Sequence, residues 1–360
     1  MRKLISDFFA NHGAIDVVAT ARDGKDAMKK IQDLKPDVVT MDVEMPEMNG
    51  LEALKKIMNE NPVPIIMLSS TTKQGADNTV KAMEYGAFDF VAKPSGNISL
   101  DLHKVKDELI SKVEEASKTS AIKLRNTNNP IQSKIIQSAT KTNSLEKTIG
   151  IRKVNERIGK MVNGQWSKVS KKVILIGTST GGPRALQKVV TKIPKDVGAP
   201  ILIVQHMPAG FTKSLAERLN QLSEIQVKEA EHGDLLQNGV AYIAPGGYHL
   251  KIRKVGMAYS IVLDNTEPPR VGHRPSVDVM FEDVSQYRDF DKIAVIMTGM
   301  GYDGSNGLKA LKHTGNVIAI AESANTCIVY GMPKAAVETN IVDEFSGVEE
   351  IAQVIMKYMH

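Results

Sequence analysis

At 360 residues the chain is too long for one ordinary compact core and suits two domains. A single cysteine, Cys327, excludes an intramolecular disulfide, and because no apolar run approaches the roughly 20 residues that span a bilayer, we expect a cytoplasmic protein with no membrane insertion. The net charge of +5 does not indicate a nucleic-acid partner, because residues 117–170 alone hold 11 Lys and Arg against two acidic residues.

The first part of the chain alternates helical patterns with short apolar runs. Strands are predicted at residues 35–42, 63–68 and 89–93, and helices at 21–33, 51–60, 76–86 and 100–116. Alternation of this kind predicts parallel strands with helices on both faces of the sheet. Residues 1–117 are therefore expected to form an α/β domain with a doubly wound parallel sheet.

Polar side chains follow these three predicted strands. Asp42, Ser69 and Lys93 each lie at the end of one strand. A carboxylate, a hydroxyl and an ammonium group around one crevice suit a phosphoryl group, because they supply an acceptor, a hydrogen-bond donor and a neutralising charge. Taken alone, Asp42 is equally well explained as a capping aspartate.

Two stretches resemble a response-regulator receiver domain, which has a flavodoxin-like fold. They are Met41-Asp-Val-Glu-Met-Pro-Glu-Met-Asn-Gly50 and Gly86-Ala-Phe-Asp-Phe-Val-Ala-Lys-Pro94. The resemblance implies that Asp42 is the phospho-acceptor, that Ser69 and Lys93 assist it, and that Phe90 is the aromatic switch residue. It also implies a histidine kinase as the phosphodonor.

The opening of the chain departs from the receiver pattern. Receiver domains begin with a strand ending in an acidic pair that holds Mg²⁺, whereas this chain opens in the following helix, at residues 1–9. The sequence therefore predicts a receiver domain lacking its first strand, and we hypothesise that the native chain begins upstream. Asp42 is a candidate Mg²⁺ ligand, but the acidic pair is absent, so the sequence supports no certain Mg²⁺ site for phosphorylation.

Residues 118–171 show no sustained hydrophobic period and are rich in Asn, Ser, Thr and Lys. A local helix is predicted within them at residues 149–162. A basic polar segment of this kind is typical of a solvated linker. A basic arm that touches nucleic acid or an acidic partner is the alternative.

The last part, residues 172–355, is again α/β, with clearer strands. Strands are predicted at residues 172–176, 200–204, 240–243, 292–297 and 316–320, helices at 276–284 and 307–312, and a hairpin around 247–264. This pattern indicates a second doubly wound parallel sheet of the Rossmann-like kind, joined to the first domain by the basic linker.

Three residues of complementary chemistry follow strands of this second sheet: Ser179, His206 and Asp303. Ligands of open parallel sheets bind beyond the carboxyl ends of the strands, so the fold can bring these residues together. Hydroxyl, imidazole and carboxylate are the groups of an acyl-transfer triad, in which the base takes the serine proton and the carboxylate orients the base. The glycines beside Ser179 let backbone N–H groups approach a developing oxyanion.

Each residue alone has a plainer explanation. The stretch Gly177–Gly182 could cradle a phosphate at the start of a helix, although it lacks the G-x-G-x-x-G spacing and the lysine of a P-loop. It does satisfy G-x-S-x-G, yet the order Ser, His, Asp is not that of α/β-hydrolases. His206 could be a packed histidine and Asp303 a turn residue. The histidines show no spacing typical of a metal site. The triad is therefore predicted from the combination of all three residues and not from any one of them.

Six stretches resemble the catalytic domain of the bacterial chemotaxis protein-glutamate methylesterases. They are Ile176-Gly-Thr-Ser-Thr-Gly-Gly-Pro183, Val204-Gln-His-Met-Pro208, Ile243-Ala-Pro-Gly-Gly247, Pro275-Ser-Val-Asp-Val-Met-Phe281, Met297-Thr-Gly-Met-Gly-Tyr-Asp-Gly304 and Gly331-Met-Pro333. Their number, order and spacing make chance agreement improbable.

This second resemblance implies the roles of the site residues. Ser179 is the nucleophile, His206 the general base and acid and Asp303 its orienter, with Thr180 and Met300 near the oxyanion. The implied substrate is a glutamyl methyl ester on a chemoreceptor's cytoplasmic helices, with deamidation of receptor glutamines as a second activity. Catalysis is expected to need no cofactor, and the phosphodonor to be the chemotaxis histidine kinase. In this family the receiver covers the catalytic crevice until it is phosphorylated.

Two other classes of function stay open on the sequence. One is a signalling module that binds receptors or a kinase through the receiver and carries a degenerate catalytic half. The other is a nucleotide-binding α/β domain, which the glycines of residues 177–182 favour. The intact serine, histidine and aspartate argue against the first of these.

Overall fold

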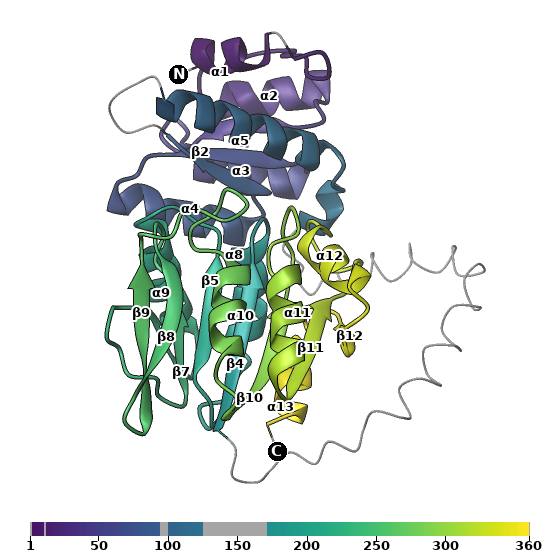
Figure 1. Cartoon of the computed structure of the whole chain (residues 1–360). Helices are drawn as coiled ribbons and strands as arrows, with labels where there is room; N and C mark the ends of the chain where they lie inside the picture. The colour runs from purple at the N-terminus through teal and green to yellow at the C-terminus, as the bar shows by residue number, and fades with distance from the viewer. Residues whose placement is uncertain (1, 11, 94–99, 125–170, 360) are drawn as a thin grey trace, which may run out of the picture.

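The computed structural model describes residues 2–10, 12–93, 100–124 and 171–359, and shows two α/β domains stacked on one another (Figure 1). Most of the predicted linker, including the helix expected at 149–162, lies outside the described residues. The helix α5 (Leu100–Ser117) precedes this gap, and the strand β4 (Lys171–Thr178) follows it. No described helix has the length and apolar character needed to cross a membrane.

The N-terminal domain is built on a parallel three-stranded sheet in the order β1-β2-β3. Its strands are β1 (Val39–Asp42), β2 (Ile65–Ser69) and β3 (Asp89–Ala92). Its helices are α1 (Arg2–Phe9), α2 (Gly24–Leu34), α3 (Gly50–Glu60), α4 (Lys73–Tyr85) and α5, followed by the 3₁₀ turn η1 (Ala121–Leu124). The elements predicted for this domain are confirmed, with shifts of a few residues at their ends.

Local sequence chemistry starts three of these helices. Asp23, Asn49 and Thr72 precede α2, α3 and α4, and each side chain accepts a hydrogen bond from a backbone N–H of the first turn. Such caps satisfy amide groups that have no partner within the helix. The strand between them, β2, is buried along its whole length, which explains its continuous apolar run.

The sheet of this domain has β1 as an outer strand within the described chain. Val17 and Val18 precede it in a stretch that belongs to no helix or strand, and their exposed fractions are 45% and 63%. The absence of a first strand stays a prediction.

The C-terminal domain has a parallel seven-stranded sheet in the order β12-β11-β10-β4-β5-β7-β6. Besides β4, its strands are β5 (Ile201–Gln205), β6 (Gln226–Glu229), β7 (Val240–Ile243), β10 (Phe290–Ile296), β11 (Val317–Glu322) and β12 (Glu344–Ser346). Its helices are α8 (Gly182–Val190), α9 (Phe211–Leu222), α10 (Val277–Ser285), α11 (Ser305–Thr314), α12 (Met332–Glu338) and α13 (Ile351–Lys357).

The predicted hairpin is an antiparallel pair, β8 (His249–Val255) with β9 (Ala258–Asp264), beside the main sheet. Every predicted strand of this domain is confirmed. The short outer strands β6 and β12 and the helices α8, α9, α12 and α13 had no counterpart in the sequence-based predictions.

The direction of the strand order reverses at β4. The chain passes from β4 to its neighbour β5 on one side, and later returns to β10 on the other side. In open parallel sheets, ligands bind where the direction of strand order reverses, at the carboxyl ends of the strands. The segments that follow β4, β5 and β10 therefore converge at one edge of the sheet.

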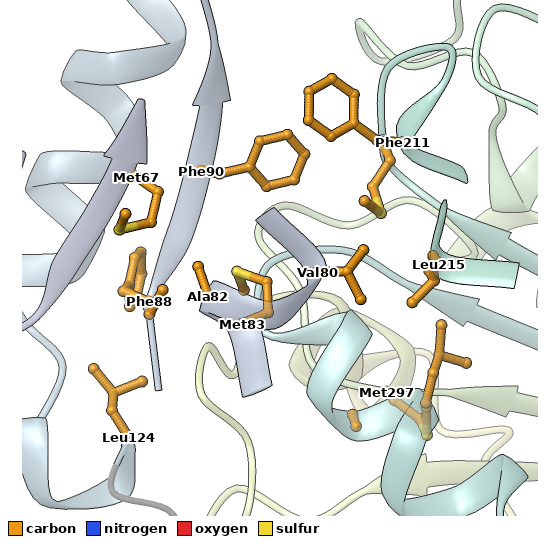
Figure 2. Packing of buried hydrophobic residues seen from close by; sticks show 14 of the residues in the cluster. Met67, Val80, Ala82, Met83, Phe88, Phe90, Leu124, Phe211, Leu215 and Met297 are labelled. Carbon is orange, nitrogen blue, oxygen red and sulfur yellow. The ribbon is translucent and has the colours of Figure 1, made fainter. Parts of the chain in front are cut away.

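The N-terminal domain sits on that same edge, with α4 lying against α8 and α9 (Figure 1). Figure 2 shows the apolar part of this contact, where Val80 and Met83 of α4 lie near Leu215 of α9. The rings of Phe90 in β3 and Phe211 in α9 stack with centroids 4.8 Å apart. Buried side chains of both domains thus form one continuous cluster across the boundary.

Candidate active site

Three strand ends bring Ser179, His206 and Asp303 into one hydrogen-bonded row. The Nδ1 atom of His206 lies 3.2 Å from Ser179 Oγ, and its Nε2 atom lies 2.8 Å from an oxygen of Asp303. Ser179 is 8% exposed, and the side chains of His206 and Asp303 are 5% and 2% exposed. The serine, the imidazole and the carboxylate therefore meet in the order that proton transfer from the serine requires.

Backbone contacts fix the position of Ser179 directly after β4. Its N–H donates to the carbonyl of Thr298 at 3.0 Å, and its own carbonyl accepts from Gly182 at 2.7 Å. Gly181 begins the following helix with φ +77°, a backbone conformation that favours glycine. Gly182 leaves no room for a side chain, since a Cβ there would lie 1.9 Å from the amide oxygen of Gln205. The glycines of the sequence motif are thus required by this turn.

Asp303 is a buried carboxylate with both oxygens hydrogen bonded. It accepts from the Ser276 hydroxyl at 2.8 Å and from the backbone N–H groups of Val277 and Asp278 at 2.7 and 2.9 Å, besides its contact with His206. Burial by itself would raise the pKa of Asp303, but the hydrogen bonds from His206 and from the two amides lower this pKa to about 2. The carboxylate is therefore ionised at neutral pH.

An ionised Asp303 determines the tautomer of His206. A carboxylate without a proton can only accept, so Nε2 of the ring carries the hydrogen that points to Asp303. The Nδ1 atom then has a free lone pair directed at Ser179 Oγ. This is the tautomer in which His206 can act as a general base.

The predicted oxyanion residues Thr180 and Met300 lie on the two backbone segments that flank Ser179. A Cβ at Gly299 would come within 2.8 Å of the Ser179 Cβ, so the segment leading to Met300 packs directly against the serine. Within the described chain no hydrogen-bond partner is found for the backbone N–H of Thr180 or of Met300. Both amides are available to a developing negative charge on a substrate oxygen.

A buried glutamate that the sequence analysis missed supports this part of the site. Glu322, at the end of β11, accepts from the Thr298 N–H at 2.8 Å and from the Thr326 hydroxyl at 2.9 Å. The Thr298 hydroxyl in turn donates to the carbonyl of Thr180 at 2.9 Å. Glu322 thereby ties the loop after β10 to the loop after β4. Its only sequence signal is an acidic residue at the end of a buried strand.

The predicted phosphorylation site forms a separate cluster in the N-terminal domain. The ammonium group of Lys93 lies 2.6 Å from the Asp42 carboxylate. The Glu44 N–H donates to Asp42 at 3.0 Å. Ser69 lies at the end of the neighbouring strand, but its buried hydroxyl donates to the Gly75 carbonyl at 3.0 Å rather than to Asp42. The structure thus brings Lys93, and not the Ser69 hydroxyl, into contact with Asp42.

A magnesium site at Asp42 stays a prediction. No group of three His, Cys, Asp or Glu side chains in the described chain is arranged to hold a metal. The ammonium of Lys93 lies beside the carboxylate of Asp42.

A carboxylate of the N-terminal domain reaches the residue next to the nucleophile. The Thr180 hydroxyl donates to Asp89 at 2.7 Å, and Lys112 of α5 lies 3.3 Å from the same oxygen. Burial opposes the charge on Lys112, but the carboxylates of Asp89 and Glu108 outweigh burial and raise its pKa. Phe90, the predicted aromatic switch residue, follows Asp89 directly and packs on Phe211. The domain boundary therefore lies at the catalytic row itself.

Comparison with known proteins assigns both halves of the chain. Residues 174–355 match the family described as CheB methylesterase, and residues 1–103 match the response regulator receiver domain.

The chain is also similar to named proteins and to a solved structure. It is 51% identical to the protein-glutamate methylesterase/protein-glutamine glutaminase of Geobacillus kaustophilus (strain HTA426), over 99% of this chain and 95% of that protein. It is 48% identical to the protein of the same name from Bacillus subtilis (strain 168), over 99% and 94%. The crystal structure of the Thermotoga maritima CheB methylesterase catalytic domain is 41% identical, with a TM-score of 0.51, and the match covers 53% of this chain and all of that one.

Proposed function

Because the chain belongs to the CheB methylesterase family and carries a response regulator receiver domain, we propose that it hydrolyses glutamyl methyl esters on the cytoplasmic helices of chemoreceptors. We propose further that it deamidates glutamine side chains on the same receptors. The observation that carries the proposal is the row from Ser179 through His206 to Asp303. Membership of this family favours the hydrolase over the nucleotide-binding alternative.

The first half of the reaction forms an acyl-enzyme. Ser179 Oγ attacks the carbonyl carbon of the ester while its proton passes to Nδ1 of His206. The carbonyl oxygen becomes an oxyanion that accepts hydrogen bonds from the backbone N–H groups of Thr180 and Met300, and each such donor is worth roughly 3–4 kcal/mol in the transition state. The negative charge of Asp303 stabilises the imidazolium that forms.

Collapse of the oxyanion re-forms the carbonyl and breaks the bond to the methoxy oxygen. Methanol leaves with the proton from His206 Nδ1. Water then attacks the acyl-enzyme and gives a proton to His206, which returns it to Ser179 Oγ as the glutamate carboxyl group is released. A glutamine side chain follows the same steps with ammonia as the leaving group.

The receiver domain supplies the control. We infer that a chemotaxis histidine kinase donates a phosphoryl group to Asp42, which adds negative charge beside Lys93. Without the phosphoryl group, the receiver lies over the catalytic row, and its Asp89 accepts a hydrogen bond from the Thr180 hydroxyl. Phosphorylation shifts the population toward forms in which this contact is released, so that a receptor helix reaches Ser179. Catalysis itself needs no cofactor in this scheme.

Replacement of the nucleophile tests the proposal. Ser179→Ala should abolish methanol release from methylated receptor membranes, because the ester intermediate forms on the Ser179 hydroxyl, while the thermal unfolding midpoint stays within a few degrees. Ser285→Ala is the matched control, because Ser285 lies at the far end of α10 and donates only to the Glu282 carbonyl. Near-normal release by Ser179→Ala would remove the serine mechanism.

Regulation is tested with a small-molecule phosphodonor in the same assay. We expect the phosphodonor to raise methanol release by the wild-type chain and to have no effect on Asp42→Asn. A wild-type chain with no esterase activity, with or without phosphodonor, would instead support the non-enzymatic signalling module.

A further inference from the structure

A second histidine lies flat on the catalytic imidazole. The ring centroids of His206 and His273 are 3.8 Å apart and their planes differ by 10°. This is the separation of two rings in van der Waals contact over their faces. The contact is not part of the hydrogen-bonded row, since His273 touches the face of the ring and not its nitrogen edge.

A tight turn presents His273 to the catalytic ring. Arg270 and His273 exchange two backbone hydrogen bonds, of 3.0 and 2.9 Å. The two residues between them, Val271 and Gly272, have φ values of 51° and 81°. Two successive positive φ values are typical of the type I′ turn, which fixes the direction of the residues at its ends. The position of His273 is therefore set by the backbone.

Ion pairs and a backbone contact brace this turn against the rest of the domain. The guanidinium of Arg270 pairs with Glu267 at 2.8 Å and also with Glu282 of α10. The carbonyl of Arg274 accepts from the Gly247 N–H at 2.9 Å. The support under His273 thus reaches α10 and the loop after β7, and a rigid support is what a positioning group requires.

His273 stays uncharged while its neighbour changes charge. Burial lowers the pKa of His273 to about 3, and the nearby His206 and Lys112 act in the same direction, while Asp303 opposes them. At neutral pH the ring of His273 is therefore a neutral aromatic face. A neutral aromatic face stabilises a cation above it, such as the imidazolium formed when His206 accepts the serine proton.

We propose that His273 is a positioning residue for the hydrolysis, which holds the His206 ring in the plane that directs Nδ1 at Ser179 Oγ. Hydrogen bonds at Nδ1 and Nε2 fix the two ends of the ring but leave it free to tilt about the line between them. Contact over the whole ring face removes this tilt. The inference rests on the proposed function, because it assigns His206 the role of the base.

The test compares three variants in the full chain: His273→Ala, His273→Asn and His273→Phe. Loss of the flat ring in the first two should lower kcat for methanol release by about 10- to 100-fold, as expected when a reacting group is misplaced by about 1 Å, while KM changes less than about twofold. His273→Phe restores an aromatic face and should return kcat to within about threefold of wild type. Thermal unfolding separates loss of fold from loss of positioning.

Labelling of Ser179 by a fluorophosphonate gives a second readout that needs no receptor. His273→Ala should slow labelling by the same 10- to 100-fold, and His273→Phe should restore it with the pH dependence of the wild type. Wild-type labelling without methanol release would count against the receptor ester as the substrate, while labelling would still test His206 as the base and His273 as its positioning residue.

Two results would overturn the role of His273. One is a kcat and a labelling rate for His273→Ala within about twofold of wild type. The other is a folded His273→Phe that is as slow as His273→Ala, because the ring nitrogens and not the aromatic face would then be required.

Discussion

At the scale of single residues, the buried carboxylate of Asp303 decides what His206 can do. Its pKa of about 2 keeps it ionised, so the imidazole proton stays on Nε2 and the lone pair on Nδ1 faces the serine. A neutral amide in place of the carboxylate can turn its NH₂ group toward Nε2. The imidazole would then carry its proton on Nδ1 and could no longer accept one from Ser179.

We therefore expect Asp303→Asn to lower kcat for methanol release on the order of 10⁴-fold, through the wrong tautomer. The loss should be smaller than that caused by Ser179→Ala. The check is steady-state methanol release together with circular dichroism, since the amide also accepts fewer hydrogen bonds from Val277 and Asp278. A folded Asp303→Asn chain that retains more than a tenth of wild-type activity would contradict the tautomer argument.

The catalytic row could be predicted from the sequence because its members follow strands that the hydrophobic pattern identifies. Parallel strands end at one edge of the sheet, so Ser179, His206 and Asp303 could be expected to lie near one another, and the strand order β10-β4-β5 makes them neighbours. The ring contact of His273 could not be predicted. It depends on a turn in the segment between β9 and α10, and no hydrophobic period reports the direction of a turn.

At the scale of elements, α10 and α11 cap each other through two aspartates. Asp303, which precedes α11, accepts from the first amides of α10. Asp278, in the first turn of α10, accepts from the N–H groups of Gly304 and Gly307 at 2.9 and 2.7 Å. Amides at a helix start lack partners within the helix, so each aspartate satisfies donors of the other helix. Asp278 thereby fixes the segment that carries Asp303.

Removal of this cap should affect both stability and rate. Asp278→Ala leaves two buried amides unpaired, which costs about 1–3 kcal/mol for each group in the free energy of unfolding. Burial and the neighbouring Asp303 raise the pKa of Asp278, so the charge itself is unfavourable there. Asp278→Asn keeps one acceptor oxygen without that charge, and should retain most of the stability and of kcat.

Chemical denaturation and methanol release measure the two effects side by side. If Asp278→Ala unfolds at the wild-type denaturant concentration, the cross-capping adds nothing to stability. If Asp278→Asn loses as much activity as Asp303→Asn, Asp278 acts in the chemistry and not through the support of Asp303.

Most of the elements that the sequence analysis missed give weak local signals. Helices α8, α9 and α12 begin at glycines, and no side chain caps their first amides. They therefore lack the aspartate, asparagine or threonine signal that marks α2, α3 and α4. The strands β6 and β12 are four and three residues long and carry polar side chains at the ends of the sheet. Short outer strands have too little apolar alternation for the pattern to detect.

At the scale of the whole molecule, the receiver covers the catalytic edge through an apolar contact and a bidentate ion pair. Arg218 of α9 donates to the two carboxylate oxygens of Glu84 in α4, at 2.6 and 3.0 Å. The hydrogen bond to Glu84 raises the pKa of Arg218, although burial opposes this. Because the Arg218 side chain is 36% exposed, water screens the pair and its contribution is about 0.2–1 kcal/mol.

An ion pair of this strength makes a small but measurable contribution to the stability of the closed form, in which the receiver covers the catalytic row. Arg218→Ala and Glu84→Ala should each raise methanol release by the unphosphorylated chain by up to about fivefold, because loss of about 1 kcal/mol from the closed form shifts its equilibrium by that factor. A phosphodonor should raise methanol release by these variants by a smaller factor than it raises release by the wild type. Arg288→Ala is the matched control, because Arg288 is exposed just before β10, at the end of the sheet opposite the receiver.

The charge swap Glu84→Arg with Arg218→Glu separates the pair from its single members. The double variant keeps both charges with their positions exchanged, so its rate of methanol release should return toward that of the wild type. Glu84→Arg alone and Arg218→Glu alone should each release methanol faster than the wild type. High salt should activate the wild type and leave the single variants nearly unchanged, since it screens the same attraction. If the single variants and the swap all release methanol at the wild-type rate, the pair does not restrain the receiver, and the other contacts between the domains, among them Phe90 with Phe211 and Asp89 with Thr180, carry the closed form.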